Sequence, residues 1–496
     1  MIRTSHVHAR TRIAAVCAAV AALLGSGAAH ANVPATAFAS AADHRHAAYP
    51  SASALAIAVH PDQIGNPLRP GFIGLSFGAA TLAADDYAAT DLAGYLRTLG
   101  RGGILRIGGN SGDGTFWTST GEAAPSWAAG TITPQKLSHL AAVARAADWR
   151  VVLAVNLKHP DAARAADEAR YAQQIFGRSL LAIEIGNEPN FYYRSETAYF
   201  ADFHAYAAAI EQAAPGVRVT GPDAETNHQA YLPAFTADET ANPTPGLAEI
   251  TDHTYPLSVC GGQTVTAAQL LGTGAVRYES ANADALVSAA RALHVTPAMT
   301  ETNSVVCAGE AGVSDAFASS LWALDYSLLL AQHGVANAQF MDGTNAAGCD
   351  PYTPLCPTTG DLSPRPIYYG MLAASLVGSG AFVGLTNPDT ADVRAYAVRE
   401  RRQLTVVLDD VQDPATSAAT TITLNLGTTR LHDGRLIALT TSDPAGLAAT
   451  GGITLGGRQV GPHGAFLPPH ASHVTVRGET AMVTVQPGSA VIIRFD

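Results

Sequence analysis

Two glutamates each follow directly on an apolar run, and this placement suggests paired-carboxylate chemistry. Glu188 lies in IEIGNEPN (183–190) and Glu301 lies in AMTETNS (298–304). Taken alone, an acid before a proline is equally typical of a helix start, where it would only complement the helix dipole. A pair of glutamates facing one cavity can do more. One acid can donate a proton to the leaving oxygen of a glycoside while the other attacks the anomeric carbon.

The two glutamates can meet only if strand ends bring them together, and the chain has eight short apolar runs that alternate with helical stretches. One expected helix covers 314–333, with Ser314 as its N-cap and Gly334 just past its end. Such alternation predicts an α/β fold of the (β/α)8 TIM barrel type, in which the C-terminal strand ends line one mouth. A doubly wound sheet is the competing architecture, but no G-x-G-x-x-G follows the first run. The expected strands are 72–78, 103–110, 150–157, 180–187, 217–223, 249–256, 296–303 and 336–343.

The pattern changes near Val383, where alternating strands with turn residues between them replace the helical stretches. This pattern predicts a C-terminal β-sandwich domain, which an N-terminal strand preceding the barrel joins. We therefore expect a signal peptide (1–31), a disordered lead-in (32–53), the joining strand (54–65), the barrel (66–382) and the sandwich (383–496).

The N-terminus has the order of a secretory signal peptide. Three arginines precede an apolar run from Ile13 to Leu24, and the small residues that follow include Ala29-His30-Ala31. This order predicts cleavage after Ala31 and a secreted or periplasmic protein. The apolar run is about half of the ~20 residues that span a bilayer, and no later stretch is longer. We therefore expect no membrane span.

Four cysteines remain after the signal peptide, which removes Cys17. Four cysteines in an exported chain allow three pairings. We favour Cys349 with Cys356, which are local in a proline-rich loop, and Cys260 with Cys307, which would tie two neighbouring loops. A zinc site is the alternative, but no C-x-x-C or C-x-x-H spacing supports one, so we predict no metal.

The charge of the chain disfavours nucleic acid as a partner. The formal net charge is −12 and there are only two lysines, Lys136 and Lys158. An acidic protein is a poor general binder of nucleic acid. Lys158 ends the expected third strand and is the better placed to bind an acidic substrate, although an ordinary solvated lysine is equally expected there. We expect a monomer.

Several stretches resemble a known clan of enzymes. IGNEPN ending the fourth strand, TET ending the seventh and DHTYP (252–256) resemble the barrel clan of retaining glycosidases. More narrowly, LRIGGNSGD (105–113), 301–325 and PRPIYYGMLAASLVG (364–378) are similar to glycoside hydrolase family 79, the heparanase and β-glucuronidase family. The likeness covers roughly residues 55 to 496.

This resemblance implies a role for each matching residue. Glu188 is implied to be the acid/base and Glu301 the nucleophile. Asn187 would bond the sugar 2-hydroxyl, and Tyr255 would donate to Glu301 and hold it ionised. Asn110 would line the sugar pocket.

Other polar residues near the strand ends have plainer interpretations. We read Arg106 as part of a core ion pair with Glu184 rather than as a substrate contact. We read His253 as a supporting or packing histidine and not as a metal ligand. Asp223 and Glu225 end the expected fifth strand and could be carboxylates at the rim of the mouth, but we favour ordinary turn residues.

The chain departs from the family at one place. Family 79 heparanases follow the nucleophile with a Tyr-Gly-Gly run that grips the uronate carboxylate, whereas this chain has Val306, Cys307, Ala308 and Gly309 there. The tyrosine hydroxyl is lost. The backbone N–H groups of Ala308 and Gly309 remain candidates for binding the carboxylate.

The resemblance as a whole implies an exported retaining β-glucuronidase of the heparanase-like type that needs no cofactor. Its substrate would be a carbohydrate, either a glycosaminoglycan of the heparan sulfate type or another glucuronide-bearing glycan, cleaved by double displacement. Another retaining barrel glycosidase, such as an arabinofuranosidase, is the alternative enzyme. A non-catalytic carbohydrate-binding protein is the other alternative, and the presence of both carboxylates argues against it.

Overall fold

The computed structural model describes residues 53–85, 91–225, 230–345, 348–386, 392–428 and 430–496. The expected signal peptide and all of the expected lead-in except Ser53 lie outside the described residues. No helix in the described part of the chain is long and apolar enough to cross a membrane.

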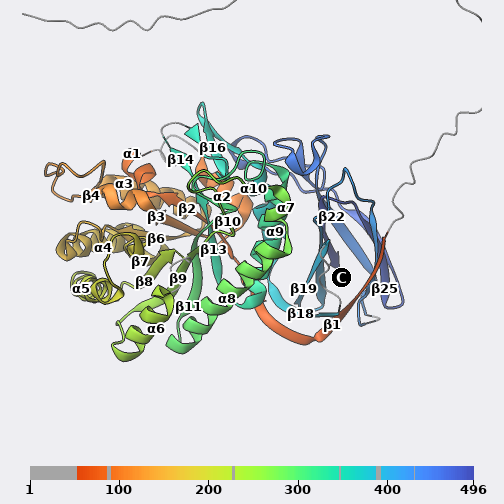
Figure 1. Ribbon diagram of the computed structural model, residues 1–496, viewed down its shortest axis with the longest axis horizontal. Coiled ribbons are helices and arrows are strands. Elements are labelled where there is room, and N and C mark those ends of the chain that lie inside the picture. The colour runs from red at the N-terminus through yellow and green to blue at the C-terminus, as the bar shows by residue number, and fades with distance from the viewer. Residues whose placement is uncertain (1–52, 86–90, 226–229, 346–347, 387–391, 429) are drawn as a thin grey trace, which may run out of the picture. The chain divides into compact units, whose positions relative to one another are not determined.

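Eight parallel strands close into a barrel, as the eight apolar runs predicted. Neighbours around the barrel follow the order of the chain, and the last strand pairs with the first to complete it (Figure 1). The strands are β2 (Ile73–Gly78), β3 (Ile104–Gly108), β6 (Arg150–Val155), β7 (Leu180–Ile185), β8 (Val219–Glu225), β9 (Leu247–Thr254), β11 (Thr296–Thr302) and β13 (Asn337–Asp342). They are almost entirely buried because helices cover their outer faces, which is why several of them, such as β6 and β7, are mostly apolar.

Helices connect these strands around the outside of the barrel (Figure 1). Their buried sides are rich in alanine and leucine, which lets them lie close against the strands. The longer ones are α2 (Leu92–Leu99), α3 (Pro134–Ala147), α4 (Ala162–Phe176), α5 (Glu196–Ala213), α6 (Tyr231–Ala241), α8 (Thr273–Leu293), α9 (Phe317–His333) and α10 (Pro366–Leu376).

Helix α9 ends where the sequence predicted but begins later. Gly334 follows its last residue with φ 108°, a conformation that glycine adopts without strain. The N-cap is Ala316, which has no side chain able to cap, so the assignment of Ser314 as N-cap was wrong. The Ser314 hydroxyl instead accepts from the Glu310 N–H at 3.0 Å and lies 2.9 Å from the Ser304 hydroxyl, inside the preceding loop.

The remaining strands form a separate β-rich domain with its own apolar core. The N-terminal strand β1 (Ser53–Leu68) belongs to it, parallel to β21 and antiparallel to β18. Strands β22 and β26 also pair, so the ten-stranded sheet turns back on itself and encloses the core between its two layers. Its other strands are β18 (Gly380–Thr386), β19 (Val393–Glu400), β20 (Gln403–Asp410), β21 (Thr420–Asn425), β22 (Asp433–Thr441), β23 (Ile453–Leu455), β24 (Ser472–Arg477), β25 (Thr480–Val485) and β26 (Ser489–Phe495).

Helix α9 lies between the barrel and this sheet domain (Figure 1). All of its residues from Phe317 to Ala331 are buried, as expected for a helix that is apolar around most of its circumference. Asp325 is the charged exception, and it is partnered from the sheet domain. The Arg394 guanidinium pairs with it, and the Tyr396 hydroxyl donates to it at 2.6 Å.

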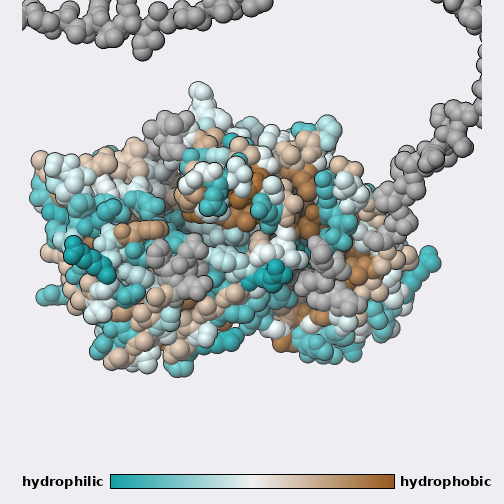
Figure 2. Space-filling model, in the orientation of Figure 1, coloured by the Kyte–Doolittle hydropathy of each residue, from teal (hydrophilic) through white to brown (hydrophobic). Residues whose placement is uncertain are grey.

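The face of the molecule shown in Figure 2 is mostly hydrophilic or weakly polar, and its hydrophobic residues gather in small areas. Two disulfides, Cys260–Cys307 and Cys349–Cys356, form as the sequence analysis favoured. Disulfides persist in oxidising compartments, so they are consistent with an exported protein.

Candidate active site

The two glutamates singled out from the sequence lie together at the C-terminal mouth of the barrel. Glu188 follows β7, and Glu301 lies near the end of β11. A carboxylate oxygen of each lies within 4.8 Å of the other. Glu188 has a left-handed backbone with φ 43°, and its N–H donates to the Asp223 carbonyl at 2.8 Å. A strained, non-glycine conformation held in this way is typical of functional sites.

Glu301 is held by groups that favour its ionised form. Arg106 donates to its Oε2 at 2.7 Å, and the Tyr255 hydroxyl donates to its Oε1 at 2.8 Å. Burial works against ionisation, but the positive charges of His253 and Arg106 and these two hydrogen bonds outweigh it. The pKa of Glu301 therefore lies below its ordinary value.

Glu188 has the opposite preference. Burial raises its pKa, and the negative charge of Glu301 raises it further, although a hydrogen bond with His253 Nδ1 at 3.2 Å opposes both. Two neighbouring carboxyl groups with pKa values displaced in opposite directions can serve as one proton donor and one nucleophile.

Arg106 connects several polar residues beneath the mouth. It forms the expected ion pair with Glu184, at 2.6 Å from both carboxylate oxygens. It also donates to Ser76 at 2.9 Å, in addition to its bond with Glu301. The core-pair interpretation was therefore correct but incomplete, since the same guanidinium contacts the catalytic candidate.

Asn187 and Asn110 are bonded to each other at the mouth. The Asn187 Oδ1 accepts from Arg106 at 2.7 Å, and its Nδ2 donates to the Asn110 Oδ1 at 3.0 Å. A carboxamide has two N–H donors, so one remains for a ligand. Asn110 begins the short helix η2 (Asn110–Gly114) and is exposed to solvent.

Asp223 is a site residue for which the sequence favoured a plainer role. It lies inside β8, whose residues are all buried, so the interpretation of Asp223 and Glu225 as turn residues was wrong. Its carboxylate accepts from the Thr300 hydroxyl at 2.6 Å and lies 3.6 Å from His253 Nε2. Burial and the charge of Arg106 favour neutral His253, but Asp223, Glu188 and Glu301 prevail and raise its pKa to about 10.

Tyr352 is a site residue that the sequence analysis missed. Its ring centroid lies 6.4 Å from that of Tyr255, and burial together with the charge of Glu301 raises its pKa far above the ordinary range. The Tyr352 carbonyl accepts from Asn303 Nδ2 at 2.9 Å. Its position between Cys349 and Cys356 was the available signal, because a disulfide-closed loop after the eighth strand must lie at the mouth.

The loop that departs from the family pattern, Val306 to Gly309, is held by a strand pairing and a disulfide. Strands β10 (Leu257–Ser258) and β12 (Val305–Val306) pair, and the Cys260–Cys307 disulfide follows directly. Cys307, Ala308 and Gly309 all have positive φ, at 66°, 75° and 86°. A side chain on Gly309 would approach the Tyr352 backbone nitrogen to 2.8 Å, so this close approach requires glycine.

Lys158 is already paired in the structure. Its ammonium lies 3.2 Å from the Asp113 carboxylate and 5.8 Å from the ring centroid of Tyr192, and its side chain is 47% exposed. This salt bridge was not anticipated. A substrate group at this place would have to share Lys158 with Asp113.

Two groups of residues in the described part of the chain have metal-ligand types at close range. The first is Glu188, His253 and Glu301. Arg106 beside Glu301 and the raised pKa of His253 make this group unsuited to a cation. The second is His204, Asp238 and Glu239, in which the histidine bonds Asp238 at 2.6 Å and Thr244 at 2.9 Å, so its ring nitrogens are in use.

The combination of this barrel with a β-rich domain is a fold shared with solved glycosidases. No protein-family model and no curated protein matches this sequence. A solved 4-O-α-L-rhamnosyl-β-D-glucuronidase from Fusarium oxysporum is similar, with a TM-score of 0.75 and 21% identity, over 88% of this chain and 100% of that one.

Two further solved structures are similar over 89% of this chain and 99% of their own. A GH51 arabinofuranosidase from Xanthomonas axonopodis pv. citri has a TM-score of 0.60 and 12% identity, and the bifunctional glucanase-xylanase CelM2 from a metagenome library has 0.59 and 14%. The resemblance to barrel glycosidases therefore extends to the fold.

Proposed function

We propose that this protein is a retaining glycoside hydrolase that cleaves β-linked glucuronic acid, in heparanase-like fashion, from glycosaminoglycans or other glucuronide-bearing glycans. The observation that carries the proposal is the pair Glu188 and Glu301, with oxygens within 4.8 Å and pKa values displaced in opposite directions. Retaining enzymes hold their two carboxyl groups about 5–5.5 Å apart, whereas inverting enzymes need ~6.5–9.5 Å to admit a water. The short separation favours the retaining mechanism.

The first step forms a covalent intermediate. Glu301, ionised through Arg106 and Tyr255, attacks the anomeric carbon while the bond to the leaving oxygen breaks. Glu188, whose raised pKa favours its protonated form, transfers its proton to that oxygen. The free N–H of Asn187 would bond the 2-hydroxyl of the sugar, a contact that strengthens in the transition state.

The second step returns the enzyme to its starting state. Glu188, now ionised, takes a proton from water as the water oxygen bonds to the anomeric carbon. The bond to Glu301 breaks, the sugar leaves with its original configuration, and Glu188 is again protonated. These steps need no cofactor.

Recognition of a uronate rests on residues at the rim. The Ala308 and Gly309 N–H groups are one candidate, since the loop that carries them packs against Tyr352 beside Glu301. Lys158 is the other candidate, and it would exchange part of its pairing with Asp113 for the substrate. The printed activity of the Fusarium oxysporum neighbour also supports a glucuronide substrate.

A panel of chromogenic glycosides tests the proposal, together with heparan sulfate and heparin. We expect hydrolysis of the β-glucuronide with a β-configured first product by NMR. Hydrolysis of the α-L-arabinofuranoside alone would instead favour the arabinofuranosidase alternative, which the similarity to the GH51 enzyme keeps open. Binding without hydrolysis of any substrate would favour a non-catalytic carbohydrate-binding protein.

A further inference from the structure

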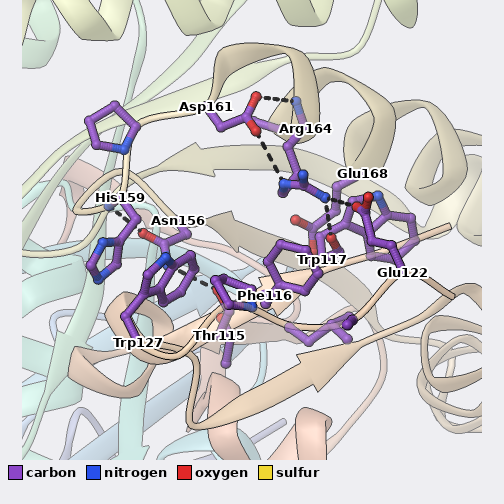
Figure 3. A pocket seen from close by; sticks show the side chains of 15 residues that line it. Thr115, Phe116, Trp117, Glu122, Trp127, Asn156, His159, Asp161, Arg164 and Glu168 are labelled. Atoms are coloured by element: carbon purple, nitrogen blue, oxygen red, sulfur yellow. Dashed lines mark hydrogen bonds and ion pairs between the residues drawn. The ribbon is translucent and has the colours of Figure 1, made fainter. Parts of the chain in front are cut away.

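A separate pocket opens between the segment that follows β3 and the start of α4 (Figure 3). Its volume is about 520 Å³, within the range of ~300–1,000 Å³ typical of small-molecule sites. None of Glu188, Glu301, Asn187 and Tyr255 lines it. The segment contributes β4 (Thr115–Trp117) and the loop to β5 (Gly130–Ile132), and the other wall comes from 156–168.

One carboxyl group in this pocket has an oxygen without a hydrogen-bond partner among the described residues. Glu168 lies on α4 next to Arg164 in Figure 3, and only 4% of its surface is exposed. No group among the described residues forms a hydrogen bond with its buried Oε1. A buried polar atom left without a hydrogen bond destabilises the folded protein, so a ligand that bonds this atom would explain it.

The donors around Glu168 are committed elsewhere. Arg164, one helical turn away, pairs with Glu122 at 2.6 Å and with Asp161 at 3.2 Å. The Trp117 indole donates to Asp167 at 2.8 Å. Both bonds of the Asn156 amide nitrogen go to backbone oxygens. These donors are therefore used by other acceptors, and Oε1 of Glu168 has no hydrogen bond within the described structure.

Aromatic rings form the rest of the wall. The Trp127 ring stacks on the His159 ring at 3.9 Å between centroids, and Phe116 meets Trp127 edge-on at 6.1 Å. The Arg164 guanidinium covers the other side of the pocket at 4.3 Å from the Phe116 ring centroid. Trp127 is partly exposed at 36%, so its indole is open to a ligand.

We propose that this pocket is a second saccharide-binding site that takes a neutral sugar ring, with Glu168 bonding its hydroxyls and Trp127 and Phe116 contacting its apolar face. A hydroxyl both donates and accepts, so it satisfies Glu168 in either protonation state. Burial raises the pKa of Glu168 to about 8, which makes the protonated form common near neutrality.

Charge decides against an acidic sugar. Glu122, Asp161 and Glu168 line the pocket, and Arg164 is the single arginine among its lining residues and is shared by two of the acids. A uronate or sulfate would enter beside these acids, and the one arginine that lines the pocket is already paired. The pocket would thus add affinity for a glycan that carries neutral units near the bond to be cleaved. Other polar ring compounds could also fit this pocket, and we name a saccharide as the ligand because of the proposed function.

The test is a titration of the full protein with methyl β-D-glucopyranoside, by calorimetry and by tryptophan fluorescence. We expect saturable binding that is about tenfold weaker for methyl β-D-glucuronide. Of the four tryptophans, only Trp127 is substantially exposed, since Trp117, Trp149 and Trp322 are buried, so fluorescence reports this pocket. Tyr255→Phe, at the barrel mouth, should leave this binding unchanged.

Substitutions at Glu168 separate a binding role from a structural one. Glu168→Leu should weaken binding about tenfold yet raise Tm by about 1–3 °C, because it removes an unsatisfied buried group. Glu168→Gln should keep binding within about threefold, since the amide supplies a donor and an acceptor at the same place. Trp127→Ala should weaken glucoside binding about tenfold. Because Trp127 is partly exposed, this effect does not depend on how the core repacks. Leu467→Ala, a surface change at a residue 63% exposed, is the control.

Several results would overturn the inference. They are the absence of saturable glucoside binding, tighter binding of the glucuronide, or tighter binding of tetramethylammonium, which would indicate a cation site. A lower Tm with unchanged binding in Glu168→Leu would show a structural role instead. Because no turnover is measured, glucoside binding by a protein that hydrolyses no glycoside would count against the proposed function and not against this pocket.

Discussion

The barrel mouth and the contact between α9 and the sheet domain both bury an arginine among carboxyl groups, but they treat those carboxyls differently. At the mouth, Arg106 and Tyr255 both donate to Glu301, and its pKa lies below the ordinary value. At the contact, Arg394 and Tyr396 donate to Asp325 in the same way, while neighbouring Asp409 has neither oxygen bonded within the described structure.

The pKa of Asp409 shows, by contrast, how the groups around Glu301 act on that carboxyl. Burial and the charge of Asp325 raise the pKa of Asp409 well above its ordinary value, although Arg394 opposes them. Burial is comparable at Glu301, yet the shift has the opposite sign. The neighbouring charges, together with the hydrogen-bond donors, therefore decide whether a buried carboxyl keeps its charge. One arrangement prepares a reactive anion, whereas the other joins two domains.

The largest expected effect tests whether the barrel mouth controls activity while the contact between α9 and the sheet domain controls stability. Glu301→Gln should lower kcat/KM by on the order of 10⁴-fold or more, because the nucleophile is removed. Asp325→Asn should leave kcat/KM of the folded protein near its original value but lower the free energy of unfolding by about 3 kcal/mol, since Arg394 loses its charged partner. Kinetics and urea denaturation of both variants measure this. Near-full activity in Glu301→Gln would show that the nucleophile is misassigned.

The second effect concerns the other carboxyl at the mouth. Glu188→Ala should lower the rate on poor leaving groups by about 10²–10⁴-fold, because proton donation is lost. On an activated aryl glucuronide the loss should be smaller, and azide should restore part of the rate with a glycosyl azide as product. No azide effect on any substrate would argue against Glu188 as the acid/base.

The third effect compares the two tyrosine donors. Activity requires ionised Glu301 and protonated Glu188, so kcat/KM should fall as pH drops through the lowered pKa of Glu301 and as pH rises through the raised pKa of Glu188. Tyr255→Phe should move the acid limb to higher pH and reduce kcat about tenfold, because one hydrogen bond to Glu301 is lost.

Tyr396→Phe is the matched control, since it removes a similar bond to Asp325. It should cost about 1 kcal/mol of stability and leave the pH profile in place. A shifted acid limb in this variant, or an unshifted one in Tyr255→Phe, would contradict the division of roles.

The smallest effect concerns Lys158 at the rim. Lys158→Ala should reduce turnover of a glucuronide polymer a few-fold and that of a nitrophenyl glucuronide less, because an exposed contact contributes ~0.2–1 kcal/mol. Added salt should weaken polymer turnover in the original protein, and sparsely sulfated chains should be preferred over heparin. Arg435→Ala, which breaks an exposed pair with Asp496 on the sheet domain, is the control. An equal loss of turnover on both substrates would show that Lys158 does not bind the polymer.

The amino-acid sequence by itself determined the architecture and the positions of the two glutamates. Parallel strands that are covered by helices read as unbroken apolar runs, and their order in the chain already places the ends of β7 and β11 at one mouth. The cysteine pairs followed from local spacing and loop order. These features depend on neighbours along the chain or on the repeat of the fold, which a sequence displays directly.

Only the tertiary structure decided the chemical state of the site. Asp223 looked like a turn residue, Tyr352 carried no motif, and Glu168 is one of two adjacent acids in the α4 segment, with no motif around it. Their roles depend on which donors from distant elements reach them: Thr300 and His253 for Asp223, and none in the described chain for Glu168. The charge of a buried carboxyl is set within a few ångströms by such partners, and those distances exist only after the barrel has closed.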